Sequence, residues 1–260
     1  MDKDHKKTFL VPFDGGEAST KASYFALEIA KFEPTKIVFI HQDAIPEEED
    51  EVTIDKDLRK ALFDAEISFY VMEKRGGELT DVIVETAEEL NADLIIMGTY
   101  GNNGTSFDTN TSKIIERAGC SVLAIPYKTS FSKIKRVAFA CDFRHIKDST
   151  ALMKFWFIAL KMKAEIKIVF VNSDRKKVSE FWNEEVERTL EFFFDNFTHD
   201  YDIVEGEDIE QAIHNYVHDK NIDLLGILPR NHNKNNLRES TGQLTKLLST
   251  HASIPILALD

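Results

Sequence analysis

The stretch of this sequence best suited to chemistry is a polar loop, GTYGNNGTSFDTNTS, at residues 98–112. Gly98, Gly101 and Gly104 punctuate the loop, and a helix is predicted to begin near Thr111. Glycine lets backbone amides approach a ligand closely and adopt positive φ. The free amides at a helix start, where the helix dipole is positive, attract anions. Together with the hydroxyl and amide side chains before the helix, they form a candidate phosphate-binding loop.

The same loop could also be an ordinary surface loop without a ligand. Glycine and asparagine also mark surface loops that end in a capped helix, and an isolated glycine-rich loop is a weak motif. The sequence has no G-x-x-x-x-G-K-[ST], so there is no Walker lysine, and no G-x-G-x-x-G follows the first apolar run. A P-loop and a dinucleotide-binding fold are therefore unsupported. On pattern alone, the phosphate loop and the surface loop both stay open.

The elements that must position this loop belong to an internal repeat. Four segments recur in the same order at offsets of about 130 residues. Each is a short, nearly continuous apolar run, which is typical of a strand covered on both faces in a parallel sheet. The four pairs are KTFLVPFD (7–14) with KRVAFACD (135–142), KIVFIHQD (36–43) with KIVFVNSD (167–174), NADLIIMG (91–98) with NIDLLGIL (221–228), and VLAI (122–125) with ILAL (256–259).

Amphipathic segments alternate with these runs, and they predict helices. Five strands and four helices in each copy predict two doubly wound parallel-sheet α/β domains in tandem, of the Rossmann-like type. The boundary is expected in PYKTSFSK (126–133), which gives domains at 1–128 and 133–260. The clearest helical segments are 18–32, 78–90, 149–162 and 206–220.

In such sheets, ligands lie beyond the carboxyl ends of the strands, where the strand order reverses. Three stretches of the first copy should therefore converge on one site. They are VPFDGG (11–16), IHQD (40–43) and the glycine-rich loop.

Composition limits the classes of partner. The chain of 260 residues carries a net charge of −13, which argues against nucleic acid or an anionic membrane as the main partner. Its apolar runs are far shorter than the roughly 20 residues that cross a bilayer. Cys120 and Cys141 lack metal-type spacing, so we expect a reduced, cytoplasmic protein without a metal site. No arrangement of acid, base or nucleophile indicates catalysis.

At the loop and at the first turn, the sequence resembles the universal stress protein family. That family carries Gly-x2-Gly-x9-Gly-[Ser/Thr] after its fourth strand and Pro-x-Asp after its first. Gly98 and Gly101 match the first two glycines, Thr111 stands where the third is expected, and Ser112 matches the hydroxyl position. VPFD (11–14) supplies the Pro-x-Asp turn. The resemblance covers the first copy throughout and implies an adenine nucleotide α-hydrolase-like fold.

The resemblance also implies a ligand, ATP or AMP, with Mg²⁺ left open. Nucleotide-binding members hold adenosine between the first turn and the end of the second strand, and phosphates on the glycine loop. Thr111 adds a Cβ where the family has hydrogen, which narrows the approach of a phosphate, while its hydroxyl offers a donor. By resemblance, Asp14 is expected near the adenosine, the Ile40 and His41 backbone at the adenine edge, and Gly98, Gly101 and Ser112 on the ribose and phosphates. The other predicted nucleotide-binding residues are Pro12, Phe13, Met97 and Thr111.

The second copy resembles the family in a degenerate form. Asp142 keeps the aspartate, but Ala140 and Cys141 replace the proline and its neighbour. The loop at 228–246 has no glycine where two are needed, and Pro229 removes a backbone donor. We therefore expect no nucleotide in the second copy.

The resulting hypothesis is a tandem universal stress protein that binds ATP or AMP in its first domain and regulates a stress response, with slow hydrolysis or none. The alternative is a nucleotide-free interaction or scaffold protein in which both domains have lost binding. A protein partner is expected but not identified. By resemblance, Val122–Ile125 and Ile256–Leu259 should pair as an internal pseudo-dimer, and a further homodimer stays open.

Overall fold

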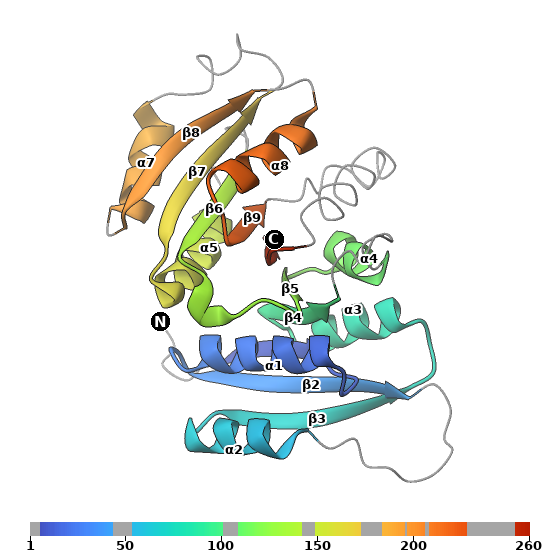
Figure 1. Ribbon diagram of the computed structural model, residues 1–260. Coiled ribbons are helices and arrows are strands. Elements are labelled where there is room, and N and C mark those ends of the chain that lie inside the picture. Colours follow the sequence, from blue (N-terminus) through green and yellow to red (C-terminus); the bar gives the residue numbers. More distant parts are fainter. Residues whose placement is uncertain are drawn as a thin grey trace. The chain divides into compact units, whose positions relative to one another are not determined.

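The computed structural model describes most of the chain, namely residues 6–43, 54–100, 109–141, 149–172, 184–195, 197–205, 208–227 and 253–260. The chain divides into two compact units, Met1–Thr129 and Ser130–Asp260. Each unit is a parallel sheet with helices packed on it (Figure 1). The predicted α/β fold is confirmed.

In the first unit, the strand order is β3-β2-β1-β4-β5, and all neighbouring strands are parallel. The order reverses at β1, which lies between β2 and β4. The elements are β1 (Lys7–Pro12), α1 (Glu17–Ala30), β2 (Thr35–Asp43), α2 (Lys56–Asp64), β3 (Ser68–Arg75), α3 (Leu79–Glu89), β4 (Leu94–Thr99), α4 (Thr109–Arg117) and β5 (Ser121–Pro126).

The helices of the first unit cover both faces of its sheet. Right-handed crossovers place α1 and α2 on one face of the sheet, because the chain moves outward in one direction from β1 to β3. The chain then returns in the other direction through β4 to β5, which places α3 and α4 on the opposite face. The helix contacts agree with this, since α1 packs against α2 and α3 against α4. The inner strands are buried on both faces, as Leu10 in β1, Val38 in β2 and Ile95 in β4 illustrate. This explains their continuous apolar runs.

A close approach between α1 and β4 depends on Gly98. A Cβ added at Gly98 would lie 2.0 Å from the Ala18 carbonyl oxygen and 2.7 Å from the Ser19 nitrogen, both backbone atoms of α1. No side chain fits there, so helix and strand meet at this point only because the residue is glycine. Gly98 therefore has a packing role that the motif did not reveal.

In the second unit, the strand order is β10-β9-β6-β7-β8, again parallel throughout. Its core is rich in aromatic side chains: Phe155 of α5 packs on Phe139 of β6 and on Phe194 of α7, with ring centroids 5.0 Å and 6.3 Å apart. The elements are η1 (Phe131–Lys133), β6 (Arg136–Cys141), α5 (Ser149–Met162), β7 (Glu165–Asn172), α7 (Glu184–Phe194), β8 (His199–Glu205), α8 (Ile209–Asp219), β9 (Leu224–Ile227) and β10 (Ile256–Ala258).

The repeated letters NAD and NID before β4 and β9 form the same clamp in both units. Asn91 and Asn221 end their helices with φ of 47° and 51°, a conformation that asparagine tolerates better than most residues. Asp93 accepts a hydrogen bond from the Thr8 backbone nitrogen at 2.9 Å, and Asp223 accepts one from Arg136 at 2.9 Å. In each unit, the aspartate thus ties the start of one strand to the start of its neighbour.

This clamp gives a paired prediction. We expect Asp93→Ala and Asp223→Ala each to lower the free energy of unfolding of their own unit by about 1–3 kcal/mol, because each leaves part-buried backbone donors without an acceptor. Urea denaturation with hydrogen exchange, read separately in each unit, measures this. Asp219→Ala, which removes an exposed carboxylate of α8, is the control. Equal stability of all three variants and the wild type would contradict the clamp.

Candidate functional site

The candidate site is the carboxyl edge of β1, β2 and β4, where the strand order reverses. The ends of β1 and β2 are tied together there. The Phe13 backbone nitrogen donates to the Ile40 carbonyl at 2.8 Å, and His41 Nδ1 lies 2.9 Å from the Phe13 carbonyl, to which it donates as Nδ1–H. The predicted residues of the first turn and of the second strand end therefore do meet. The His41 ring serves as a cross-strand link.

The turn between β1 and α1 holds an ordered carboxylate. Asp14 Oδ1 accepts hydrogen bonds from the Gly16 nitrogen at 2.8 Å and from the Ser19 hydroxyl at 2.6 Å. Burial acts to raise the pKa of Asp14, but these hydrogen bonds and the nearby His41 outweigh it, so the pKa lies below its ordinary value. Asp14 is a fixed negative charge at this edge.

Tyr100, which follows β4 directly, reaches across to this turn. A Cβ added at Gly16 would lie 2.6 Å from the Tyr100 hydroxyl, so the phenol sits over the start of α1. The Tyr100 ring also packs against Tyr127, with centroids 5.7 Å apart. Sequence reasoning missed both Tyr100 and Ser19. The sequence shows that a tyrosine and a serine stand at these positions, but no motif places either residue near Asp14.

Three buried hydroxyls lie at the end of β4 and in the first turn of α4. Thr99, Thr111 and Ser112 are 3%, 0% and 4% exposed. None of their three side-chain oxygens has a hydrogen-bond partner in the part of the chain that the structure describes. Thr99 alternates with Gly98, which faces α1, so Thr99 lies on the opposite face of the sheet, the one that α3 and α4 cover. Buried polar atoms are rarely left in this state unless a ligand or water completes them.

Two further buried side chains in the first unit share this lack of a described partner. They are Thr86 on α3 and Glu116, one turn beyond Ser112 on α4. Burial raises the pKa of the Glu116 carboxyl. Thr86 is in the second half of α3 and Glu116 in the second half of α4, so they serve as comparisons and not as parts of the site.

The basic side chains of α4 are balanced by acids on α3. Lys113 pairs with Glu78 and Arg117 with Asp81, each at 2.6 Å. The hydrogen bond from Lys113 holds the pKa of Glu78 below its ordinary value. The start of α4 thus offers hydroxyls and helix amides, with little net positive charge from side chains.

The predicted site residues fall into two described groups. Pro12, Phe13 and Asp14 join Ile40 and His41 on the β1–β2 side; Met97 and Gly98 end β4, and Thr111 and Ser112 start α4, which begins at Thr109. Gly101 lies outside the described residues, as does the loop at 228–246 in the second copy. No group of three metal-ligating side chains occurs among the described residues.

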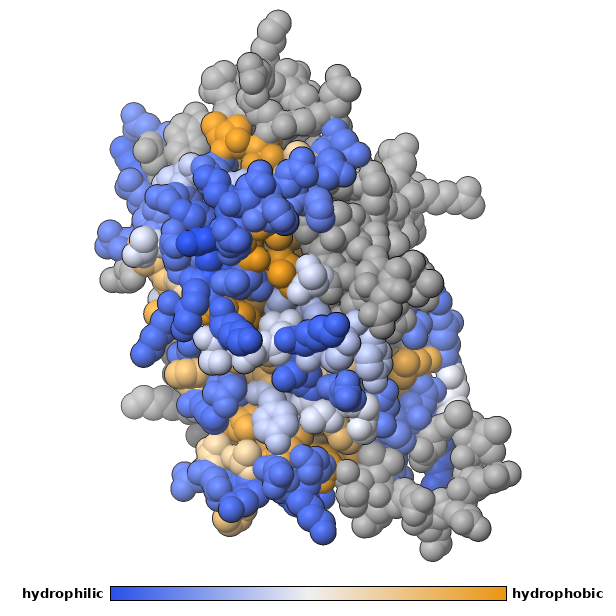
Figure 2. Space-filling model, in the orientation of Figure 1, coloured by the Kyte–Doolittle hydropathy of each residue, from blue (hydrophilic) through white to orange (hydrophobic). Residues whose placement is uncertain are grey.

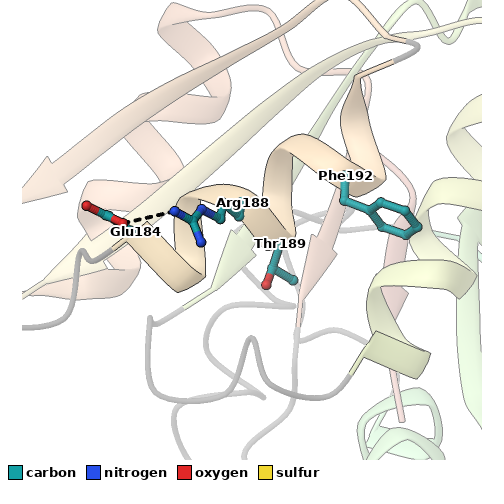
Figure 3. Close-up of a pocket in the computed structure, with 4 residues that line it drawn as sticks. All are labelled: Glu184, Arg188, Thr189 and Phe192. Atoms are coloured by element: carbon teal, nitrogen blue, oxygen red, sulfur yellow. Dashed lines mark hydrogen bonds and ion pairs between the residues drawn. The ribbon is translucent and has the colours of Figure 1, made fainter.

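A hollow elsewhere on the protein does not compete with this site. It is lined by Glu184, Arg188, Thr189 and Phe192, all on α7 of the second unit, and Arg188 pairs there with Glu184 at 3.1 Å (Figure 3). It is an open patch on one helix face. The described residues on the face drawn in Figure 2 are mostly hydrophilic, with groups of apolar residues between them. No described helix is long and apolar enough to span a membrane.

Comparison with known proteins places the first unit in a family. Residues 6–126 match the sequence model of the universal stress protein family. Over these residues the chain is similar to the universal stress protein family. The match spans every strand and helix of the first unit, including the Asp14 turn and the α4 start. The family resemblance inferred from the loop is confirmed.

Individual relatives agree with the universal stress protein assignment. Universal stress protein A homolog 1 of Coxiella burnetii is 35% identical over 81 residues, which cover 29% of this chain and 56% of that relative. This chain therefore spans little more than half the length of that curated relative.

Solved structures extend the shared fold to both units. A universal stress protein from Archaeoglobus fulgidus is similar with a TM-score of 0.73 at 18% identity, covering 97% of this chain and 98% of its own. A putative universal stress protein from Pseudomonas aeruginosa has a TM-score of 0.74 at 14% identity, covering 99% and 94%. At these identities, the likeness concerns the fold alone.

Proposed function

We propose that the first unit binds an adenine nucleotide, ATP or AMP, at the carboxyl edge of β1, β2 and β4, and that the protein acts as a nucleotide-dependent regulator of a stress response. The predicted contacts are those named from the sequence, with Gly101 among them. Thr99 joins them as a contact that the structure suggests.

The observation that carries this proposal is the set of three buried hydroxyls, Thr99, Thr111 and Ser112, which lack described partners. Burying a hydroxyl without a partner costs about 1–3 kcal/mol in protein mutational data. Phosphate oxygens accept hydrogen bonds from hydroxyls and from the free amides of a helix start. A phosphoryl group at the start of α4 would offer acceptors to the Thr111 and Ser112 hydroxyls there.

Binding without rapid hydrolysis fits the rest of the edge. His41 Nδ1 is engaged by the Phe13 carbonyl, and the Asp14 carboxylate is held by two donors. The lowered pKa of Asp14 makes its carboxylate a weak base, and the bond from Nδ1 fixes the His41 ring as a link between the two strand ends. The protein would therefore act by changing shape or partners when nucleotide binds. The second unit, by its degenerate sequence, would not bind.

Isothermal titration calorimetry with AMP and with MgATP tests the proposal. We expect one nucleotide per chain, and an affinity lowered about tenfold or more in Ser112→Ala, because a hydrogen bond to a charged phosphate is lost. Ser130→Ala, which removes a hydroxyl that contacts Ser132 in the segment between the units, is the matched control. Absence of heat with both ligands would favour the nucleotide-free scaffold, and two sites per chain would contradict a non-binding second unit.

A further inference from the structure

We propose that the first unit selects an adenine nucleotide with a single phosphate, such as AMP, over ATP that carries no metal ion. This rests on the proposed function and concerns the same site. It follows from the kind of donors at the start of α4 and from the charges around them.

The donors are neutral. Thr99, Thr111 and Ser112 offer hydroxyls, and the α4 start offers amides with a dipole equal to roughly half a positive charge. Hydroxyls and helix amides can donate to phosphate oxygens, but none of them carries a full positive charge. They supply far less positive charge than the four negative charges of metal-free ATP require.

The nearest basic side chains are already balanced. Lys113 follows Ser112 directly, but Glu78 lies 2.6 Å from its ammonium, and Asp81 lies 2.6 Å from Arg117 one turn later. The side chains of both ion pairs are about half exposed, so each pair is weak. Even so, a phosphate near either pair would meet a positive and a negative charge together and not a single cation.

The other charges at this edge do not repair the deficit. Lys128, after β5, lies over the Tyr127 ring at 5.3 Å. Arg75 ends β3, which β2 separates from β1 in the sheet. The Asp14 carboxylate, ionised because its pKa is lowered, adds a negative charge on the β1 side. The connecting residues 101–108, outside the described part, contain one aspartate and no lysine or arginine by sequence.

Space at the start of α4 is limited as well. The Thr111 side chain is fully buried, so its branched Cβ leaves less room for a phosphoryl group than glycine would. One phosphoryl group reaching its hydroxyl satisfies it.

The test is a calorimetric series on the full chain with adenosine, AMP, ATP with EDTA, and ATP with excess Mg²⁺. We expect AMP to bind at least about tenfold more tightly than metal-free ATP, since the extra charges meet no cation. Mg²⁺ should recover much of the ATP affinity by cancelling two charges. Added salt should improve metal-free ATP relative to AMP, because it screens repulsion.

A pair of variants locates the cause. Glu78→Gln removes the partner of Lys113 beside Ser112, and it should raise the affinity for metal-free ATP about two- to fivefold, more than for AMP. Asp81→Asn removes the same charge but frees Arg117, four residues and about 6 Å further along α4. Its effect should be smaller. Equal effects would show that only the net charge of the protein matters, and would overturn this assignment of the cause.

The outcomes separate the two proposals. No binding of any compound would remove the proposed function itself. Metal-free ATP binding as tightly as AMP, or adenosine binding as tightly as AMP, would overturn the selectivity while nucleotide binding stands. AMP binding more tightly than both adenosine and metal-free ATP would support the selectivity.

Discussion

Gly98→Ala should unfold the first unit or destabilise it by about 3 kcal/mol or more. The added methyl would lie 2.0 Å from the Ala18 carbonyl oxygen and 2.1 Å from its carbon, and both are backbone atoms that no rotamer change can move aside. Helix α1 would have to separate from β4. Overpacking of a core commonly costs about 1–3 kcal/mol, and backbone clashes lie at the upper end. Chemical denaturation followed by hydrogen exchange in the first unit measures the loss.

A second glycine of the same unit provides the control. Gly119, between α4 and β5, has nothing within 4 Å of an added Cβ and no positive φ. Gly119→Ala should therefore change stability by less than about 0.5 kcal/mol. If Gly98→Ala melts with the wild type, the close approach of α1 and β4 is wrong. If Gly98→Ala is destabilised as expected, a loss of nucleotide binding in this variant would reflect the damaged fold and not a lost phosphate contact.

Thr111→Val should make the free protein more stable and its nucleotide complex weaker. The hydroxyl is fully buried without a described partner, so replacing it by a methyl group of similar size removes a desolvation cost of about 1–3 kcal/mol. Threonine and valine have similar helix propensities, so α4 itself should not suffer. The melting temperature without ligand should rise by several degrees. The further rise on adding AMP should shrink, because the hydroxyl no longer meets the phosphate.

Thr86→Val separates these two effects. Thr86, in the second half of α3, is also buried and also lacks a described partner for its hydroxyl, but it is not among the predicted nucleotide contacts. This variant should gain stability and keep the full response to AMP. A Thr111→Val protein that is less stable than the wild type, or that responds to AMP like Thr86→Val, would contradict the role given to Thr111.

Much of the fold was predictable because the sequence repeats it. The apolar runs of β1, β2 and β4 reappear in β6, β7 and β9, and a buried parallel strand needs little more than such a run. The helix expected near Thr111 begins at Thr109, and α1 covers Glu17–Ala30 where 18–32 was expected. These differences are a turn or less, which is normal at helix ends.

The site was less predictable, since its contacts join residues far apart in sequence. The motif pointed to Gly98 as a ligand contact, but its tight contact is with Ala18 of α1, which no local pattern encodes. Tyr100 and Ser19 could be recognised as neighbours of the Asp14 turn only from the structure, in which the end of β4 lies next to the β1–α1 turn. The sequence also does not show that the hydroxyls of Thr99, Thr111 and Ser112 are buried without described hydrogen-bond partners, because burial depends on the packing of the folded unit.

The most direct measurement of the central claim is an amide NMR titration of the full chain with AMP. If the nucleotide rests on the carboxyl edge of the first unit, the largest shift changes will be at Phe13–Ser19, His41, Thr99, Thr111 and Ser112, and Leu224–Ile227 of the second unit will not change. Saturating AMP with no change at the start of α4, or with changes confined to the second unit, would contradict the account.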